Sequence, residues 1–108
     1  MPESSVLPFT VSSNLHRILG KQVQLKFADD FILKLTPAEA SSLSFALVAV
    51  RDGVSPEREI YMSPIASDAA FVGTVQENGM SIAMPVASLE LDWSKVGMLA
   101  ESLAVALG

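Results

Sequence analysis

The 108-residue sequence contains no cysteine and only one histidine, one tryptophan and one tyrosine. Because there is no cysteine, disulfide bonds, thiolate metal sites and a cysteine nucleophile are all excluded. His16 stands alone, whereas a zinc site needs three or four ligands and a general base needs a nucleophile and an orienting acid beside it. We therefore expect no catalytic residues, no metal site and no cofactor, and we predict that the protein is not an enzyme.

Charged residues are also scarce, and the basic ones are the minority. They make up 18% of the chain, with seven Lys and Arg against twelve Asp and Glu, so the net charge is −5. Residues 13–36 hold four basic and two acidic side chains, whereas residues 52–108 hold two basic and eight acidic ones. A nucleic-acid-binding protein must neutralise phosphates. This balance therefore predicts no nucleic-acid partner.

No uninterrupted apolar run approaches the roughly 20 residues that a membrane-spanning helix needs. Residues 1–5 show neither the basic start nor the apolar segment of a secretion signal. We therefore expect a cytoplasmic protein with no membrane partner. Half of the residues are hydrophobic, which is enough to form a core. The sequence thus predicts a single folded domain over residues 1–108.

Alternating hydrophobicity predicts strands in the first third of the chain. Residues 22–27 and Phe31–Leu35 alternate between apolar and polar side chains, and the short connection at residues 28–30 predicts a β-hairpin with one buried face. The apolar segment 6–11 contains a proline, which favours an edge strand or an extended arm. We expect a turn at residues 12–14. Residues 15–19 are ambiguous, and we interpret them as one helical turn closed by Gly20.

Two helices have clear start signals. Thr36, Pro37 and Glu39 form the pattern of a capping box with proline at the first helical position, and they predict a helix to about Arg51. Asp92 is a second candidate cap, for a helix from Trp93 to about Leu107.

Between the helices we expect further strands. They cover residues 59–65, 70–76 and 80–87 and a short segment around Leu89 and Leu91, with a primed Asn-Gly turn of positive φ at residues 77–79. The predicted fold class is α+β: an antiparallel sheet of about five to seven strands with two helices packed on one face.

The two halves of the chain show a weak similarity at an offset of 56 residues. Thr36 then aligns with Asp92, and Leu43 aligns with Leu99. One interpretation is a duplicated ββα unit, with pseudo-repeat halves at residues 15–52 and 59–108. The other is that any strand followed by a capped helix aligns in this way.

Both predicted helices are apolar on more than one side. At 100° per residue, Phe45 and Val48 lie roughly opposite the main apolar stripe of the first helix, and Met98 and Val105 lie opposite that of the second. A sheet can cover only one face of each helix, so we predict a homodimer. Trp93, at the start of the second helix, is a candidate interface anchor. The alternative is that the two helices cover one another within a monomer.

These observations favour a non-catalytic protein–protein interaction protein, of the small acidic adaptor, chaperone or inhibitor type, acting as a homodimer. The predicted interface residues are Phe45, Val48, Met98, Val105 and Trp93, and the predicted partners are a second copy of the chain and another protein. The alternative function is a small-molecule-binding protein with an apolar pocket between the sheet and the helices.

Overall fold

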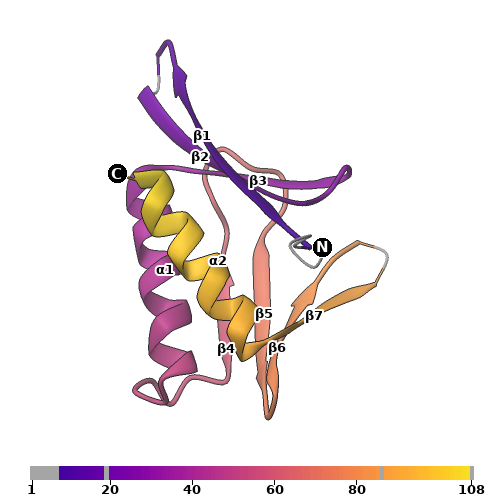
Figure 1. Ribbon diagram of the computed structural model, residues 1–108. Helices are drawn as coiled ribbons and strands as arrows, with labels where there is room; N and C mark the ends of the chain where they lie inside the picture. Colours follow the sequence, from indigo (N-terminus) through magenta and orange to yellow (C-terminus); the bar gives the residue numbers. More distant parts are fainter. Residues whose placement is uncertain (1–7, 19, 86, 108) are drawn as a thin grey trace, which may run out of the picture.

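The computed structural model describes residues 8–18, 20–85 and 87–107, and within them the chain forms seven strands and two helices (Figure 1). In chain order these are β1 (Thr10–His16), β2 (Gly20–Ala28), β3 (Phe31–Leu35), α1 (Pro37–Arg51), β4 (Glu59–Met62), β5 (Phe71–Gln76), β6 (Gly79–Ala83), β7 (Ser88–Asp92) and α2 (Trp93–Leu107). The α+β class predicted from the sequence is confirmed.

The seven strands form two antiparallel sheets, in the orders β1-β2-β3 and β4-β5-β6-β7, so the prediction of one sheet is wrong. The reason lies at the outer edge of β3. There the Lys34 backbone N–H donates to Ser67 Oγ at 2.6 Å, and Ser67 Oγ donates to the Lys34 carbonyl at 3.1 Å. At Lys34 a loop side chain thus takes up both backbone groups that a neighbouring strand would need, and among the described residues no fourth strand joins this sheet.

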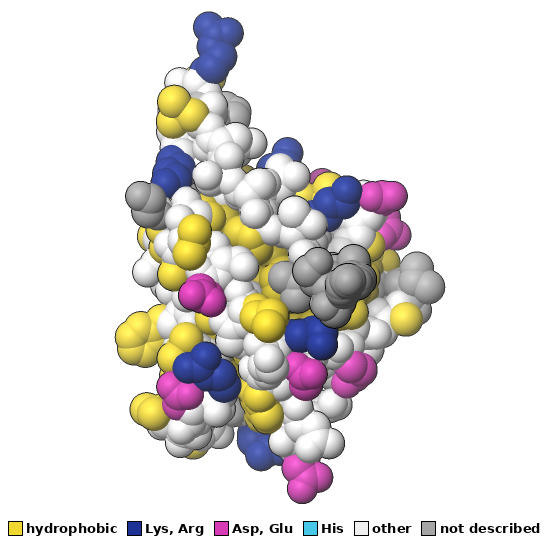
Figure 2. Space-filling model, viewed as in Figure 1, with side chains coloured by type: hydrophobic (Ala, Val, Ile, Leu, Met, Phe, Trp, Pro, Cys, Tyr) yellow, Lys and Arg dark blue, Asp and Glu magenta, His cyan; other side chains and the backbone are white. Residues whose placement is uncertain are grey.

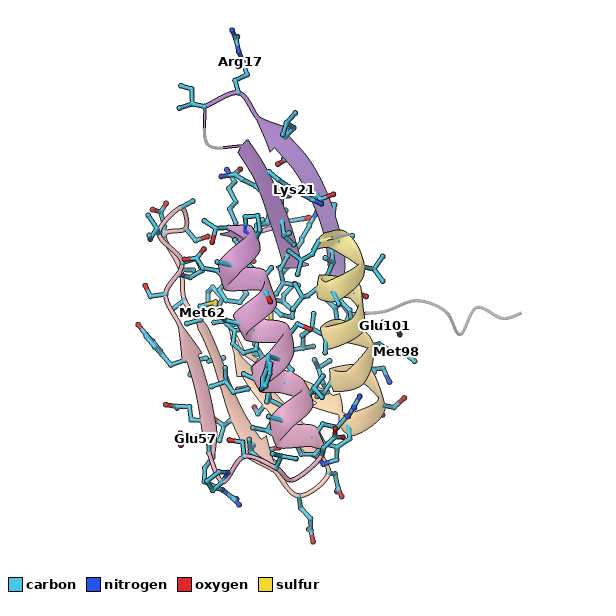
Figure 3. The ribbon with its side chains drawn as sticks, turned by 90° about the vertical axis from the view of Figure 1, so that its left-hand side faces the viewer. Arg17, Lys21, Glu57, Met62, Met98 and Glu101 are labelled. Carbon is cyan, nitrogen blue, oxygen red and sulfur yellow. The ribbon has the colours of Figure 1, made fainter. Side chains whose placement is uncertain are left out.

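The two helices lie side by side, as Figures 1 and 3 show, and Ser44 Oγ donates to the Ala100 carbonyl at 2.8 Å between them. Each helix contacts both sheets: α1 contacts β2, β3 and β4, and α2 contacts β1, β2, β6 and β7. The finer expectation, that both helices share one face, stays a prediction. The helices are 15 residues each and start 56 residues apart, which agrees with the offset in the sequence. The duplication itself stays a hypothesis.

The core fills the space between the helix pair and the sheets. Phe71 is fully buried, and its ring lies against Phe27, with 6.2 Å between the ring centroids. Phe27 in turn stacks on Phe31 at 5.7 Å. From the helices, the fully buried leucines are Leu43, Leu47, Leu99 and Leu103. The apolar stripes predicted for both helices therefore form the contact with the rest of the domain.

The capping box of α1 is present as predicted. The Glu39 N–H donates to Thr36 Oγ1 at 3.1 Å, and the Thr36 N–H donates to Glu39 Oε1 at 2.9 Å. The helix ends at Arg51, and Gly53 follows with a φ of +74°, a left-handed conformation that favours glycine.

Asp92 caps α2, because the Lys95 N–H donates to Asp92 Oδ1 at 2.9 Å. This backbone hydrogen bond is the main cause that lowers the pKa of Asp92 below its usual value of 3.8, and the nearby Lys95 ammonium adds to it. The charged carboxylate is therefore the form that the folded protein favours.

Replacing Asp92 by asparagine keeps an acceptor for the cap but removes the titrating charge. A lowered folded pKa contributes stability above the unfolded value, and that stability is lost as the pH falls through the folded pKa. We expect Asp92→Asn to unfold at a lower temperature than wild type at about pH 6, and the difference to shrink as the pH falls below 3.8 and through the lowered folded pKa. Thermal unfolding followed by circular dichroism measures this difference in melting temperature at each pH. A difference that stays constant over this range would contradict the role given to the charge.

The first strand differs most from the prediction. Residues 12–14, predicted as a turn, lie in the middle of β1, where Ser13 pairs with Val23 and Asn14 with Gln22. The predicted helical turn at residues 15–19 is also wrong, since β1 continues to His16. Pairing with β2 outweighs the turn preference of these small polar residues. Of the strand predicted over residues 6–11, residues 6 and 7 lie outside the described residues, and so does Leu19.

The turn between β5 and β6 is where the sequence predicts it, but its type is different. Gln76 pairs with Gly79, so Glu77 and Asn78 form the two-residue loop. Within the described residues only Gly20 and Gly53 have a positive φ. Position 79 favours glycine because of the close approach of β7 and not because of its φ. A Cβ at this position would overlap the Leu91 carbonyl of β7. Strands β4 and β6 end earlier than predicted, before Pro64 and Pro85.

Candidate interaction surface

The outer face of α1 carries an exposed aromatic side chain beside a shallow pocket. Phe45 is 75% exposed because it lies between the buried Leu43 and Leu47, about half a helical turn from each. The pocket, which we call the α1 pocket, has a volume of about 310 Å³. It is lined by Ser44, Phe45, Val48, Ala49, Asp52 and Val54. The structure therefore brings two predicted interface residues, Phe45 and Val48, together with the exposed Val54.

The α1 pocket has a charged rim at the end of the helix. Arg51 Nε donates to Asp52 Oδ1 at 2.9 Å, and this bond raises the pKa of Arg51 above its ordinary value. The Arg51 side chain also reaches α2, since a Cβ at Gly97 would meet Arg51 Nη1 at 2.8 Å. An apolar centre with a polar rim is the usual composition of a protein interface.

Met98 and Val105, predicted from the same argument, lie on α2. Met98 is 43% exposed and Val105 is 71% exposed, and Glu101 lies between them along the helix. Figure 3 shows Met98 and Glu101 on the side of α2 that faces away from α1. Val105 lines a different pocket from that of Phe45, together with Val11, Ser13 and Lys21 of the β1–β2 hairpin. The predicted interface residues are thus divided between two surfaces.

Trp93 has a structural role at the edge of the core. It is half-buried, it packs against the core, and its Nε1–H donates to the Glu77 carbonyl at 3.1 Å. This bond joins the start of α2 to the β5–β6 turn. Its use as an interface anchor stays a prediction.

The β1–β2 hairpin is a surface that sequence reasoning missed. It projects beyond the ends of the helices (Figures 1 and 3), and Figure 2 shows basic and hydrophobic side chains near its tip. Leu15 is 82% exposed and Ile18 is 86% exposed. The sequence offered little signal for this strand, because the three small polar residues between Val11 and Leu15 favour a turn.

In the described part of the chain, no three His, Asp or Glu side chains gather closely enough to hold a metal ion. No helix among the described residues is long and apolar enough to cross a membrane. No protein-family model matches the chain, and no curated protein or solved structure is significantly similar to it.

Proposed function

We propose that this chain is a non-catalytic protein–protein interaction protein of the adaptor, chaperone or inhibitor type, acting as a homodimer. The observation that carries the proposal is the exposure of Phe45 and Val54 around the α1 pocket, on an outer face of the molecule. A large aromatic side chain beside an apolar pocket is a typical binding hot spot. The pocket has room for an apolar side chain of a partner, and Asp52 at its rim can accept a hydrogen bond.

The alternative, a small-molecule-binding protein, needs an apolar pocket between sheet and helices. Fully buried side chains, including Phe71, Leu43 and Leu99, pack there. The pockets that we describe lie on the outer surface. The interaction function is therefore the better supported of the two.

A charge on the α1 pocket should abolish partner binding without unfolding the protein. We expect Phe45→Asp, in tagged protein purified gently from its own host, to lose at least about tenfold of any co-purifying protein, because desolvating a carboxylate in an apolar contact is costly. Native mass spectrometry identifies the bound protein and quantifies its loss.

Ile65→Asp is the matched control, since Ile65 is 91% exposed in the β4–β5 loop, outside the α1 pocket. This variant should bind like wild type, and both variants should keep the wild-type circular dichroism spectrum. Equal binding by wild type and Phe45→Asp would overturn the assignment of the α1 pocket. A specific bound small molecule in place of a protein would support the alternative function.

A further inference from the structure

In the part of the chain that the structure describes, strand β1 is an open edge without the usual protection against pairing. It lies at the end of the β1-β2-β3 sheet, and its seven residues, TVSSNLH, include no Lys, Arg, Asp, Glu or Pro. Within the described residues, no backbone hydrogen bond joins β1 to any element other than β2. Such an edge is a template on which another strand can add.

The other sheet edges of the described chain are covered or charged. Ser67 bonds both backbone groups of Lys34 at the edge of β3. Strand β4 is four residues long, begins with Glu59 and is contacted by α1. Strand β7 carries Glu90 and Asp92 among its five residues. Since charges and short length are what protect edge strands from pairing, β1 is the edge that remains available.

Apolar side chains lie beside the open edge of β1. Val11 and Ser13 pair with the fully buried Leu25 and Val23, so the odd-numbered residues of β1 point to the side of the sheet that packs on the core. On that side, Val11 lines a pocket with Val105 of α2. Further along the same side of β1 lies the exposed Leu15. A strand added to β1 would cover these side chains as well as the backbone groups.

The sequence of β1 is complementary to itself in the antiparallel direction. If two copies pair about Ser13, all seven residues are matched, with Val11 opposite Leu15 of the partner subunit and Ser12 opposite Asn14 of the partner subunit. Apolar side chains then meet apolar ones and polar side chains meet polar ones, as cross-strand pairs favour. A two-fold axis through Ser13 gives the closed symmetry of a homodimer.

The charges also favour this arrangement. Arg17, at the tip of the hairpin in Figure 3, and Glu101, on α2, have no ion-pair partner within the described chain. Glu101 lines the pocket beside Val11 and Ser12. Pairing about Ser13 brings the hairpin tip of one copy towards the other copy's Val11. Arg17 therefore approaches Glu101 of the partner subunit, in a pocket that Lys21 also lines. Opposite charges at the rim of an interface guide its register.

We propose that a second copy of the chain docks along β1, and that the two three-stranded sheets join into a six-stranded sheet. This contact gives the proposed homodimer an interface separate from the α1 pocket, which then remains open to another protein. The inference thus rests on the homodimer of the proposed function but not on its binding site.

The test is the oligomeric state of purified wild-type protein and variants, measured by sedimentation equilibrium. Wild type should have twice the 11.5 kDa mass of the chain. Ser13→Lys places two like charges opposite each other at the two-fold axis, and it should raise the dissociation constant of the dimer roughly tenfold or more. Thr74→Lys adds the same charge at an exposed position of the central strand β5 and should leave the dimer intact.

Arg17→Glu and Glu101→Arg test the register. Each variant alone should weaken the dimer, and an equimolar mixture should recover it, because every contact across the mixed dimer again joins opposite charges. A mixture no tighter than the single variants would overturn this register.

A dimer that survives Ser13→Lys but dissociates in Phe45→Asp would overturn the β1 interface and leave the proposed homodimer in place. A monomeric wild type would overturn both the interface and the homodimer.

Discussion

Replacing Phe71 by alanine should lower the free energy of unfolding by about 3–5 kcal/mol. The ring is fully buried and lies against Phe27 in the space between sheets and helices. Its removal loses the transfer free energy of the side chain and leaves a cavity that the surrounding structure closes only in part. The whole free energy of unfolding of a small domain is roughly 5–15 kcal/mol, so this one substitution removes a large part of it. Urea unfolding followed by fluorescence or circular dichroism measures the loss.

Phe45→Ala is the matched control because it deletes the same side chain at a position that is 75% exposed. We expect a change within about 0.5 kcal/mol, as for most surface substitutions. A similar destabilisation by both variants would contradict the burial of Phe71 or the exposure of Phe45. It would also remove the main support for the α1 pocket as a binding surface.

Replacing Gly79 by alanine should be the second most damaging change, at about 3 kcal/mol, the upper end of the usual cost of overpacking. The added Cβ would overlap the Leu91 carbonyl and lie 2.7 Å from the Asp92 Cα. Both obstacles are backbone atoms, so no side chain can rotate away to make room. Gly79 pairs with Asp92, and a shift there also moves the cap of α2. Chemical denaturation measures the cost.

Gly53→Ala makes the same chemical change without a clash, since no atom beyond Gly53 and its two chain neighbours lies within 4 Å of the added Cβ. Its cost comes only from the left-handed φ of +74°, and we expect about 1–2 kcal/mol. If Gly79→Ala were the milder of the two variants, the close approach of β6 and β7 would be wrong.

Local signals made much of the secondary structure predictable. The capping box around Thr36 marked the start of α1, and the alternation over Phe31–Leu35 gave β3 with its observed bounds. The division into two sheets could not be predicted, because it depends on contacts between distant parts of the chain, such as the bonds between Ser67 and Lys34, 33 residues apart. An isolated serine in a loop carries no sign of such a contact. Strand β1 could not be predicted either, because Ser12, Ser13 and Asn14 favour a turn when they have no partner strand.

The candidate surface was predictable only in part. Helical periodicity identified Phe45, Val48, Met98 and Val105 as residues opposite the core stripes, and the structure leaves Phe45, Met98 and Val105 exposed. Periodicity within one helix says nothing about how two helices are placed, so it could not show that Phe45 and Val105 line different pockets. The open edge of β1 depends on strand order, which is a property of the whole fold.

The strand orders have a consequence for how the chain reaches this structure. In both sheets every strand pairs with its neighbour in sequence, so each sheet can grow by successive hairpins that close short loops. The α1–α2 contact and the Ser67–Lys34 bonds join residues that are far apart in the chain. Closing long loops costs more entropy than closing short ones. The hairpins can therefore form before the α1–α2 contact, which joins residues as far as 56 positions apart.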